Sequence, residues 1–118
     1  MKHKDLKSRT KAFALDVIRY VEELPRDQTS NVLGRQLLRS GTSVGANYRA
    51  ASRARSQADF IAKMGIVEEE ADESAYWMEL LMEAGKARCD RTSSLLQEAD
   101  ELVAMTVASI NTAKKNRK

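Results

Sequence analysis

Apolar residues recur at three- and four-residue steps along four successive stretches of the chain, the spacing of one face of an α-helix. The first stretch ends before Pro25, because a residue that precedes proline avoids helical geometry. Ser56, with Asp59 three residues later, resembles a capping box that opens the third stretch, and Gly85 follows its end. The apolar stripes of the four stretches are Leu6, Phe13, Val17, Tyr20, Val21 and Leu24; Leu33, Leu37, Val44, Tyr48 and Ala51; Phe60, Met64, Val67, Ala71, Ala75, Met78 and Met82; and Leu95, Ala99, Leu102, Val103, Thr106 and Ile110.

Three short connections join these stretches, so consecutive helices are expected to run antiparallel. Asp27, Thr29 and Ser30 offer N-capping oxygens for the second helix. The predicted fold class is therefore all-α, an antiparallel up-down four-helix bundle that forms one domain over residues 1–118. Residues 114–118 are expected to be a frayed basic tail. One proline and five glycines leave little material for the turns of an all-β fold.

The composition excludes several other classes of protein. An apolar share of 42% is too high for a disordered chain. No apolar run approaches the roughly 20 residues that cross a membrane, and the basic start lacks the apolar core of a secretory signal. The single cysteine, Cys89, cannot form an internal disulfide. We expect a cytoplasmic protein with no membrane partner.

Charge is distributed unevenly along the chain. Residues 1–57 carry twelve Lys/Arg against five Asp/Glu, whereas residues 58–105 carry four against twelve. Such asymmetry indicates either an anionic partner for the first half or a pairing of basic and acidic helices. That pairing would occur within one molecule or across an oligomer.

The second helix contains the run GTSVGAN, whose glycines raise the question of a phosphate-binding loop. Such loops usually place a lysine beside the glycines, and this run has none. The apolar spacing also continues straight through it, which favours a helix. Gly34, Gly41 and Gly45 then fall on one flank, where another helix can approach closely.

Four arginines form a stripe on the same helix, because they lie within about 40° of a common line at 100° per residue. These are Arg35, Arg39, Arg49 and Arg53. One interpretation is a ladder of contacts to RNA or DNA phosphates, for which arginine is well suited. The alternatives are an ordinary solvated face and ion pairs with the acidic third helix of a neighbouring subunit.

The third helix is apolar on two sides. Ile66, Trp77 and Leu80 lie roughly opposite the Met64 and Met78 stripe. A helix of this kind needs two surfaces to pack against. We expect a subunit interface at Ile66, Trp77 and Leu80, unless Trp77 lies across a groove between helices of its own chain.

A family resemblance is carried by two adjoining runs, QLLRSGTSVGANYRAA and SQADFIAKMGIVEEEADESAYWMELL. They resemble the four-helix-bundle proteins encoded within intervening sequences of bacterial 23S ribosomal RNA genes. More distantly, they are similar to the accessory variability determinants of diversity-generating retroelements. The resemblance implies an up-down bundle that assembles as a homopentamer with a central channel. The retroelement relatives contact nucleic acid and a reverse transcriptase through basic surface.

Asn47, Glu70 and Glu73 match polar positions of the family. We expect them to form a hydrogen-bonded cluster between the second and third helices, because a buried carboxylate without partners is costly. The family pattern often places a glutamate where this chain has Ala50, which argues against a catalytic role for the cluster.

No catalytic constellation is recognisable. The only histidine is His3, so the EEEADE run lacks the imidazole partners of a ferritin-like metal site, and Cys89 lacks a base. We expect no catalytic residue, metal or cofactor. The sequence predicts a non-enzymatic, oligomeric binding or accessory protein that contacts RNA or DNA. The alternative is a structural module that binds itself or another protein through its arginines.

Overall fold

Four α-helices make up the computed structural model, which describes residues 5–116. The helices are α1 (Leu6–Glu22), α2 (Gln28–Ser52), α3 (Gln57–Glu83) and α4 (Cys89–Asn116). No strand occurs within these described residues. His3 and the last two residues of the basic tail lie outside them.

Side-chain caps fix where three of the helices begin. Asp27 accepts a hydrogen bond from the Ser30 N–H at 2.8 Å, and Ser56 accepts one from the Asp59 N–H at 3.0 Å. Ser56 is the cap that the sequence predicted, and Asp27 is one of its three candidates; the other two, Thr29 and Ser30, lie inside α2. Asp5 caps α1 in the same way. α3 ends at Glu83, and Gly85 two residues further on has a φ of 76°, in the left-handed region that glycine adopts without strain.

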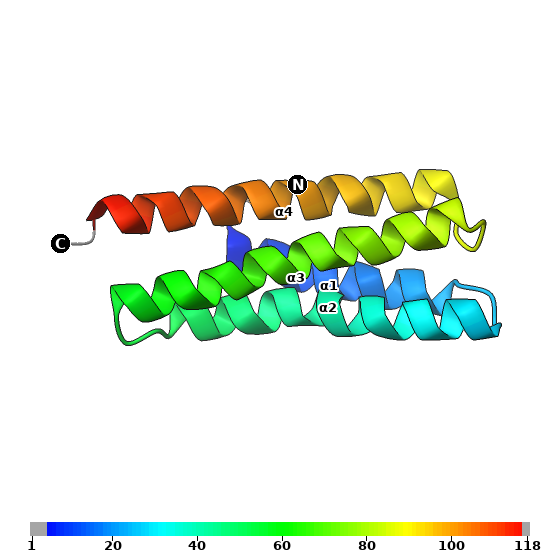
Figure 1. Cartoon of the computed structure of the whole chain (residues 1–118), viewed down its shortest axis with the longest axis horizontal. Coiled ribbons are helices and arrows are strands. Elements are labelled where there is room, and N and C mark those ends of the chain that lie inside the picture. The colour runs from blue at the N-terminus through cyan, green and yellow to red at the C-terminus, as the bar shows by residue number, and fades with distance from the viewer. Residues whose placement is uncertain (1–4, 117–118) are drawn as a thin grey trace.

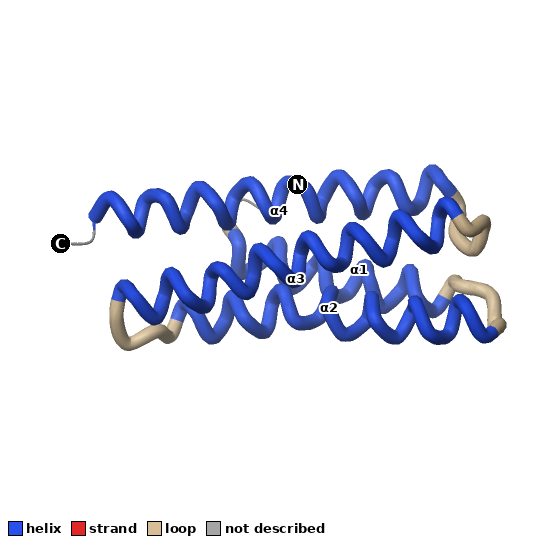
Figure 2. The backbone as a smooth tube through the Cα atoms, viewed as in Figure 1, coloured by secondary structure: helices blue, strands red, loops and turns tan. Residues whose placement is uncertain are grey.

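The helices form an elongated up-down bundle of 51 × 28 × 19 Å (Figure 1). The connections alternate between its two ends (Figure 2), so consecutive helices run antiparallel as predicted. α2 packs between α1 and α3, and α4 closes the bundle against α3 and α1. The α1–α4 interface is the smallest of the four. α1 has 17 residues and α4 has 28, so the C-terminal end of α4 extends past the start of α1.

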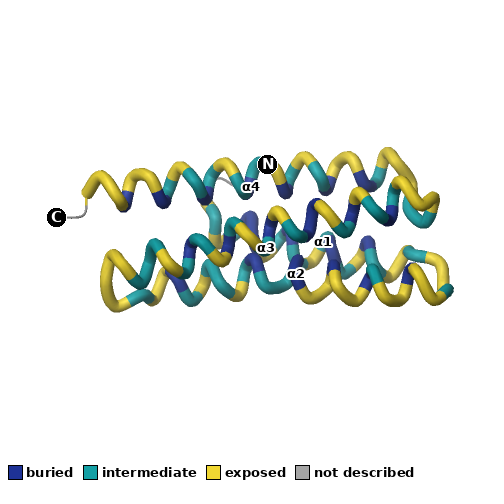
Figure 3. The backbone as a smooth tube through the Cα atoms, in the orientation of Figure 1, coloured by how far each residue is buried: buried dark blue, intermediate teal, exposed yellow. Residues whose placement is uncertain are grey.

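The predicted stripes supply the core, and the buried positions recur along the inward side of each helix (Figure 3). Phe13, Val17, Leu37, Met64 and Met78 are almost completely buried. Searched over the described residues, the chain has no helix that is long and apolar enough to cross a membrane.

Glycines in α2 let α1 approach closely, as the sequence predicted. A Cβ atom on Gly41 would lie 2.8 Å from Val17 Cγ1, and one on Gly45 would lie 3.3 Å from the carbonyl oxygen of Thr10. α1 therefore lies against the backbone of α2. This contact brings the outer side chains of the two helices together along one seam.

Candidate nucleic-acid interface

A groove of about 560 Å³ lies between the first half of α1 and the second half of α2. Four cationic residues line it: Lys7 and Lys11 from α1, Arg49 from α2, and Arg53, which follows the last residue of α2. All four are exposed. None of the lining residues is acidic; the others are Thr10, Ala14, Thr42, Gly45, Ala46, Tyr48 and Ser52. The groove is therefore a cationic channel open to solvent, with hydroxyl groups among its walls.

The antiparallel packing of α1 and α2 places these cations together. Lys7 and Lys11 are one helical turn apart on α1, and Arg49 lies one turn before Arg53 at the C-terminal end of α2. Within the described residues, none of the four forms an ion pair with a carboxylate. Their charges are thus available to an anion from outside the bundle.

Arg39 lies on the opposite flank of α2 and is engaged within its own chain. Its Nη1 donates to Glu70 Oε1 at 3.2 Å, and its Nη2 donates to Glu73. The indole N–H of Trp77 donates to the same Glu73 carboxylate at 3.2 Å. The stripe predicted on α2 therefore divides: Arg49 is turned toward α1, and Arg39 is turned toward α3.

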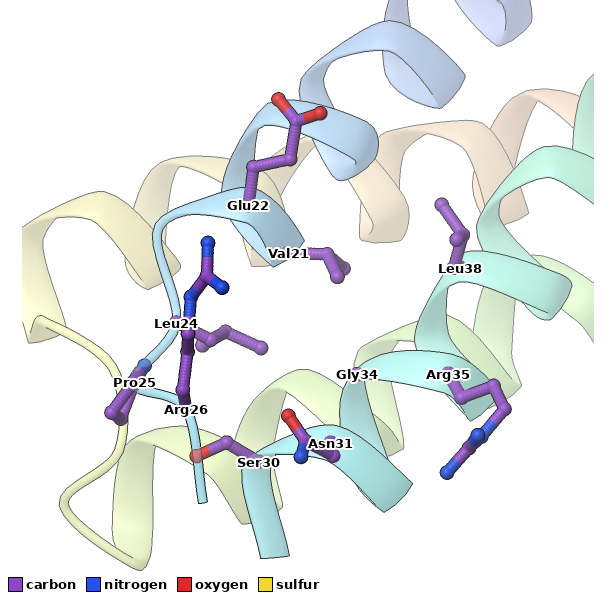
Figure 4. A pocket seen from close by; sticks show the side chains of 10 residues that line it. All are labelled: Val21, Glu22, Leu24, Pro25, Arg26, Ser30, Asn31, Gly34, Arg35 and Leu38. Carbon is purple, nitrogen blue, oxygen red and sulfur yellow. The ribbon is translucent and has the colours of Figure 1, made fainter. Parts of the chain in front are cut away.

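Arg35 lies away from the basic groove, beside a separate cavity of about 780 Å³ at the other end of the α1–α2 seam. Figure 4 shows Val21 and Leu24 extending into the space that Leu38 borders, with the Arg35 guanidinium directed away from them. Glu22 also lines this cavity. Arg35 and Arg49 thus line different cavities, while Arg39 is paired with glutamates of its own chain.

The polar cluster between α2 and α3 forms with Arg39 in place of Asn47. The Asn47 amide donates to the Ser43 carbonyl oxygen of its own helix at 2.9 Å. The buried polar contact between these helices joins the hydroxyls of Ser40 and Ser74, 2.9 Å apart. Two serines on otherwise apolar helix faces were the signal for this contact.

The side chains expected at a subunit interface differ in exposure. Ile66 is 41% exposed, while Trp77 and Leu80 are half-buried. Tyr76 is 53% exposed and stacks edge-on against Trp77, with ring centroids 5.2 Å apart. Trp77 also packs against the core of its own chain. The outer side of α3 therefore presents apolar surface among acidic residues.

Sequence reasoning missed a buried charged contact between α1 and α4. Arg9 is buried, and its Nη2 donates to Glu98 and Glu101, both at 2.6 Å. Hydrogen bonds to the two glutamates raise the pKa of Arg9 above its already high ordinary value. The contact stabilises the α1–α4 interface, the smallest of the bundle, and leaves Arg9 unavailable to a ligand.

A second buried polar contact joins the same two helices. The Tyr20 hydroxyl lies 2.9 Å from Thr92 Oγ1, and the Arg91 guanidinium lies 5.9 Å from the centre of the Tyr20 ring. Burial raises the pKa of the Tyr20 phenol above its ordinary value of 10.0. Tyr20 thus packs in the core with its hydroxyl group hydrogen-bonded to Thr92.

The described residues contain no group of histidine, cysteine or acidic side chains that could hold a metal ion. Cys89 is exposed in the first turn of α4, beside the ion pair between Arg88 and Asp90. Nothing in this part of the chain suggests catalysis. The chemistry that the geometry offers is the binding of an anion.

These features define an all-α four-helix bundle with a cationic seam between its first two helices. The chain belongs to the 23S rRNA-intervening sequence protein family, whose model matches residues 2–108. The chain is also similar to the crystal structure of a protein with unknown function from the S23 ribosomal protein family of Bacteroides thetaiotaomicron VPI-5482. The two share 35% sequence identity over 90% of this chain and 98% of that one, with a TM-score of 0.85. A search of curated proteins found no match.

Proposed function

We propose that this protein is a non-enzymatic binding protein that holds the phosphate backbone of nucleic acid, RNA in preference to DNA, in the α1–α2 groove. The observation that carries the proposal is the set of four cations in a groove without acidic lining. Clustered positive charge attracts polyanions and supplies most of the sequence-independent affinity for nucleic acid.

The groove chemistry suits phosphate better than bases. Guanidinium groups bind phosphate oxygens in a bidentate manner, and the hydroxyls of Thr42 and Ser52 are additional donors. The lining residues include no asparagine or glutamine to read base edges, so binding should show weak sequence preference. Arg39 should contribute little, because it would have to leave Glu70 and Glu73.

Self-association is part of the proposal. Ile66 and Tyr76 expose apolar surface on α3, away from the groove, and the family resemblance implies a homopentamer. Repetition of the groove around such an assembly would strengthen the positive electrostatic field that attracts a polyanion. Light scattering on the purified protein measures the subunit number, and Ile66→Glu should lower it.

The test is fluorescence anisotropy of a labelled single-stranded RNA at about 50 mM salt, where phosphate contacts are strong. The double variant Arg49→Gln/Arg53→Gln should weaken binding roughly tenfold, as two exposed charge contacts of about 0.7 kcal/mol each would give. The matched control is Arg19→Gln/Arg88→Gln, which removes the same charge at exposed positions outside the groove. It should change the affinity less than about twofold.

Two results would refute the proposal. Wild-type protein that does not bind RNA even at low salt has no such function. Equal losses in the groove variant and its control would mean that net charge alone, and not the groove, attracts RNA.

The alternative is a protein-interaction module whose arginines pair between subunits. It predicts that Arg49→Gln/Arg53→Gln breaks the oligomer and leaves the RNA affinity unchanged. Light scattering and anisotropy on the same sample distinguish the two functions.

A further inference from the structure

The packing register of α1 against α2 determines where each cationic residue of the groove lies along the bundle axis. A Cβ atom on Gly45 would lie 3.3 Å from the Thr10 carbonyl oxygen, so these two positions face each other. Lys11, the next residue of α1 after Thr10, is therefore nearly level with Gly45 along the bundle axis. Because the helices are antiparallel, Arg49 lies one turn further along, level with Lys7, and Arg53 lies one turn beyond.

The backbone positions of the groove cations thus lie at three successive levels: Lys11 first, then Lys7 with Arg49, then Arg53. Four residues of helix advance about 6 Å, so the three levels span about 12 Å. An unstacked strand covers one such step with one nucleotide, because its backbone is stretched beyond the roughly 3.4 Å rise of a stacked strand.

We infer that the groove holds one single strand of RNA that runs parallel to the helix axes, with three consecutive phosphates at these levels. The inference rests on the proposed function and adds the path of the strand along both helices, the three phosphate levels and the single-stranded form of the RNA. Tyr48, the only aromatic residue among those that line the groove, offers a surface on which a base stacks.

The cations on the two flanks of the groove are paired within the chain, which favours one strand over a duplex in this mode of binding. A duplex presents two backbones, and the second needs cations of its own. On the α3 side of the groove, Arg39 is paired with Glu70 and Glu73. On the α4 side, Arg9 is buried against glutamates. One line of available cations therefore accommodates one strand.

The test compares an oligouridylate of about twelve nucleotides with an RNA duplex of the same length, by anisotropy on the full chain. Lys7→Gln/Lys11→Gln keeps part of each aliphatic stem and removes two charges. It should weaken single-strand binding about as much as Arg49→Gln/Arg53→Gln does, roughly tenfold. The control Lys114→Gln/Lys115→Gln removes the same charge from exposed positions on α4 and should change the affinity less than about twofold.

Salt dependence supplies a second measurement. Three phosphates on a single strand give a slope of log affinity against log salt near roughly −2 per engaged subunit. Loss of Lys7 and Lys11 leaves two phosphates in contact and should reduce the slope to about −1.4. The duplex should bind more weakly than the single strand.

The outcomes separate this inference from the proposed function. Suppose that RNA binding depends on Arg49 and Arg53 but Lys7→Gln/Lys11→Gln behaves like its α4 control. The strand then crosses α2 alone, and the inference is wrong while the proposed function stands. A duplex that binds as tightly as the single strand, through the same residues, also overturns it. If wild-type protein binds neither RNA, the proposed function fails first.

Discussion

Replacing Gly41 by alanine would put a methyl carbon 2.8 and 2.9 Å from the two γ-carbons of Val17. Non-bonded carbon atoms are optimally separated by about 3.5–4.0 Å. Val17 is completely buried, and its branched side chain has one strongly preferred rotamer in a helix, so it cannot turn aside. The substitution therefore forces α1 away from α2 or strains both helices.

The expected cost follows from two opposing effects. Overpacking of a filled core costs about 1–3 kcal/mol. Alanine in a helix interior recovers up to about 1 kcal/mol relative to glycine. We expect Gly41→Ala to lower the free energy of unfolding by about 1–2 kcal/mol. Gly65→Ala, where a Cβ atom would meet nothing within 4 Å, should instead raise it by about 0.5–1 kcal/mol.

Thermal and urea unfolding followed by far-ultraviolet circular dichroism measure both variants. A chain of 118 residues should shift its Tm by about 4 °C per kcal/mol, so the two substitutions should move Tm in opposite directions. Val17→Ala added to Gly41→Ala should cost less than Val17→Ala alone, because it removes the crowded carbons. Gly41→Ala protein as stable as the Gly65→Ala variant would refute the close-approach argument.

Three further substitutions test the contacts that hold the bundle. Arg9→Ala should cost about 2–3 kcal/mol of stability in urea unfolding, since it leaves two partly buried glutamates without this partner, whereas exposed Arg19→Ala should cost under about 0.5 kcal/mol. Tyr20→Phe should cost about 1 kcal/mol at neutral pH. Because burial raises the pKa of Tyr20 in the folded state, the wild type should also lose stability as the pH rises above 10.0, a loss that Tyr20→Phe lacks. Asp27→Ala should lower Tm at neutral pH. The hydrogen bond from the Ser30 N–H lowers the pKa of Asp27, so the two Tm values should converge as the pH falls below 3.8.

The sequence was sufficient to predict the fold because its signals are local. The three- and four-residue spacing of apolar side chains identified the faces that α1–α4 bury, and Asp27 and Ser56 marked helix starts through contacts three residues away. The flank of small residues on α2 predicted a close helix neighbour, because missing side chains leave the space that Val17 fills.

The surroundings of the arginines could not be predicted in the same way. A helical projection gives the angle between Arg39 and Arg49 but does not say which neighbour lies on either side of the stripe. The neighbour of each arginine depends on the order of the helices around the bundle, which is a property of the whole chain. The contact of Arg9 with Glu98 joins residues 89 positions apart, and a lone arginine near the start of a helix gives no hint of it.

The groove exists only while α1, the shortest helix, is packed against α2. α1 supplies Lys7 and Lys11, yet it is the shortest helix and shares its smallest interface with α4. Proteins open locally in cooperative segments, and a short terminal helix belongs to the less protected ones. Detachment of α1 would abolish the groove, because α1 forms one of its walls. A ligand bound across both helices would hold α1 in place, so slower amide hydrogen exchange in α1 would report occupancy of the groove.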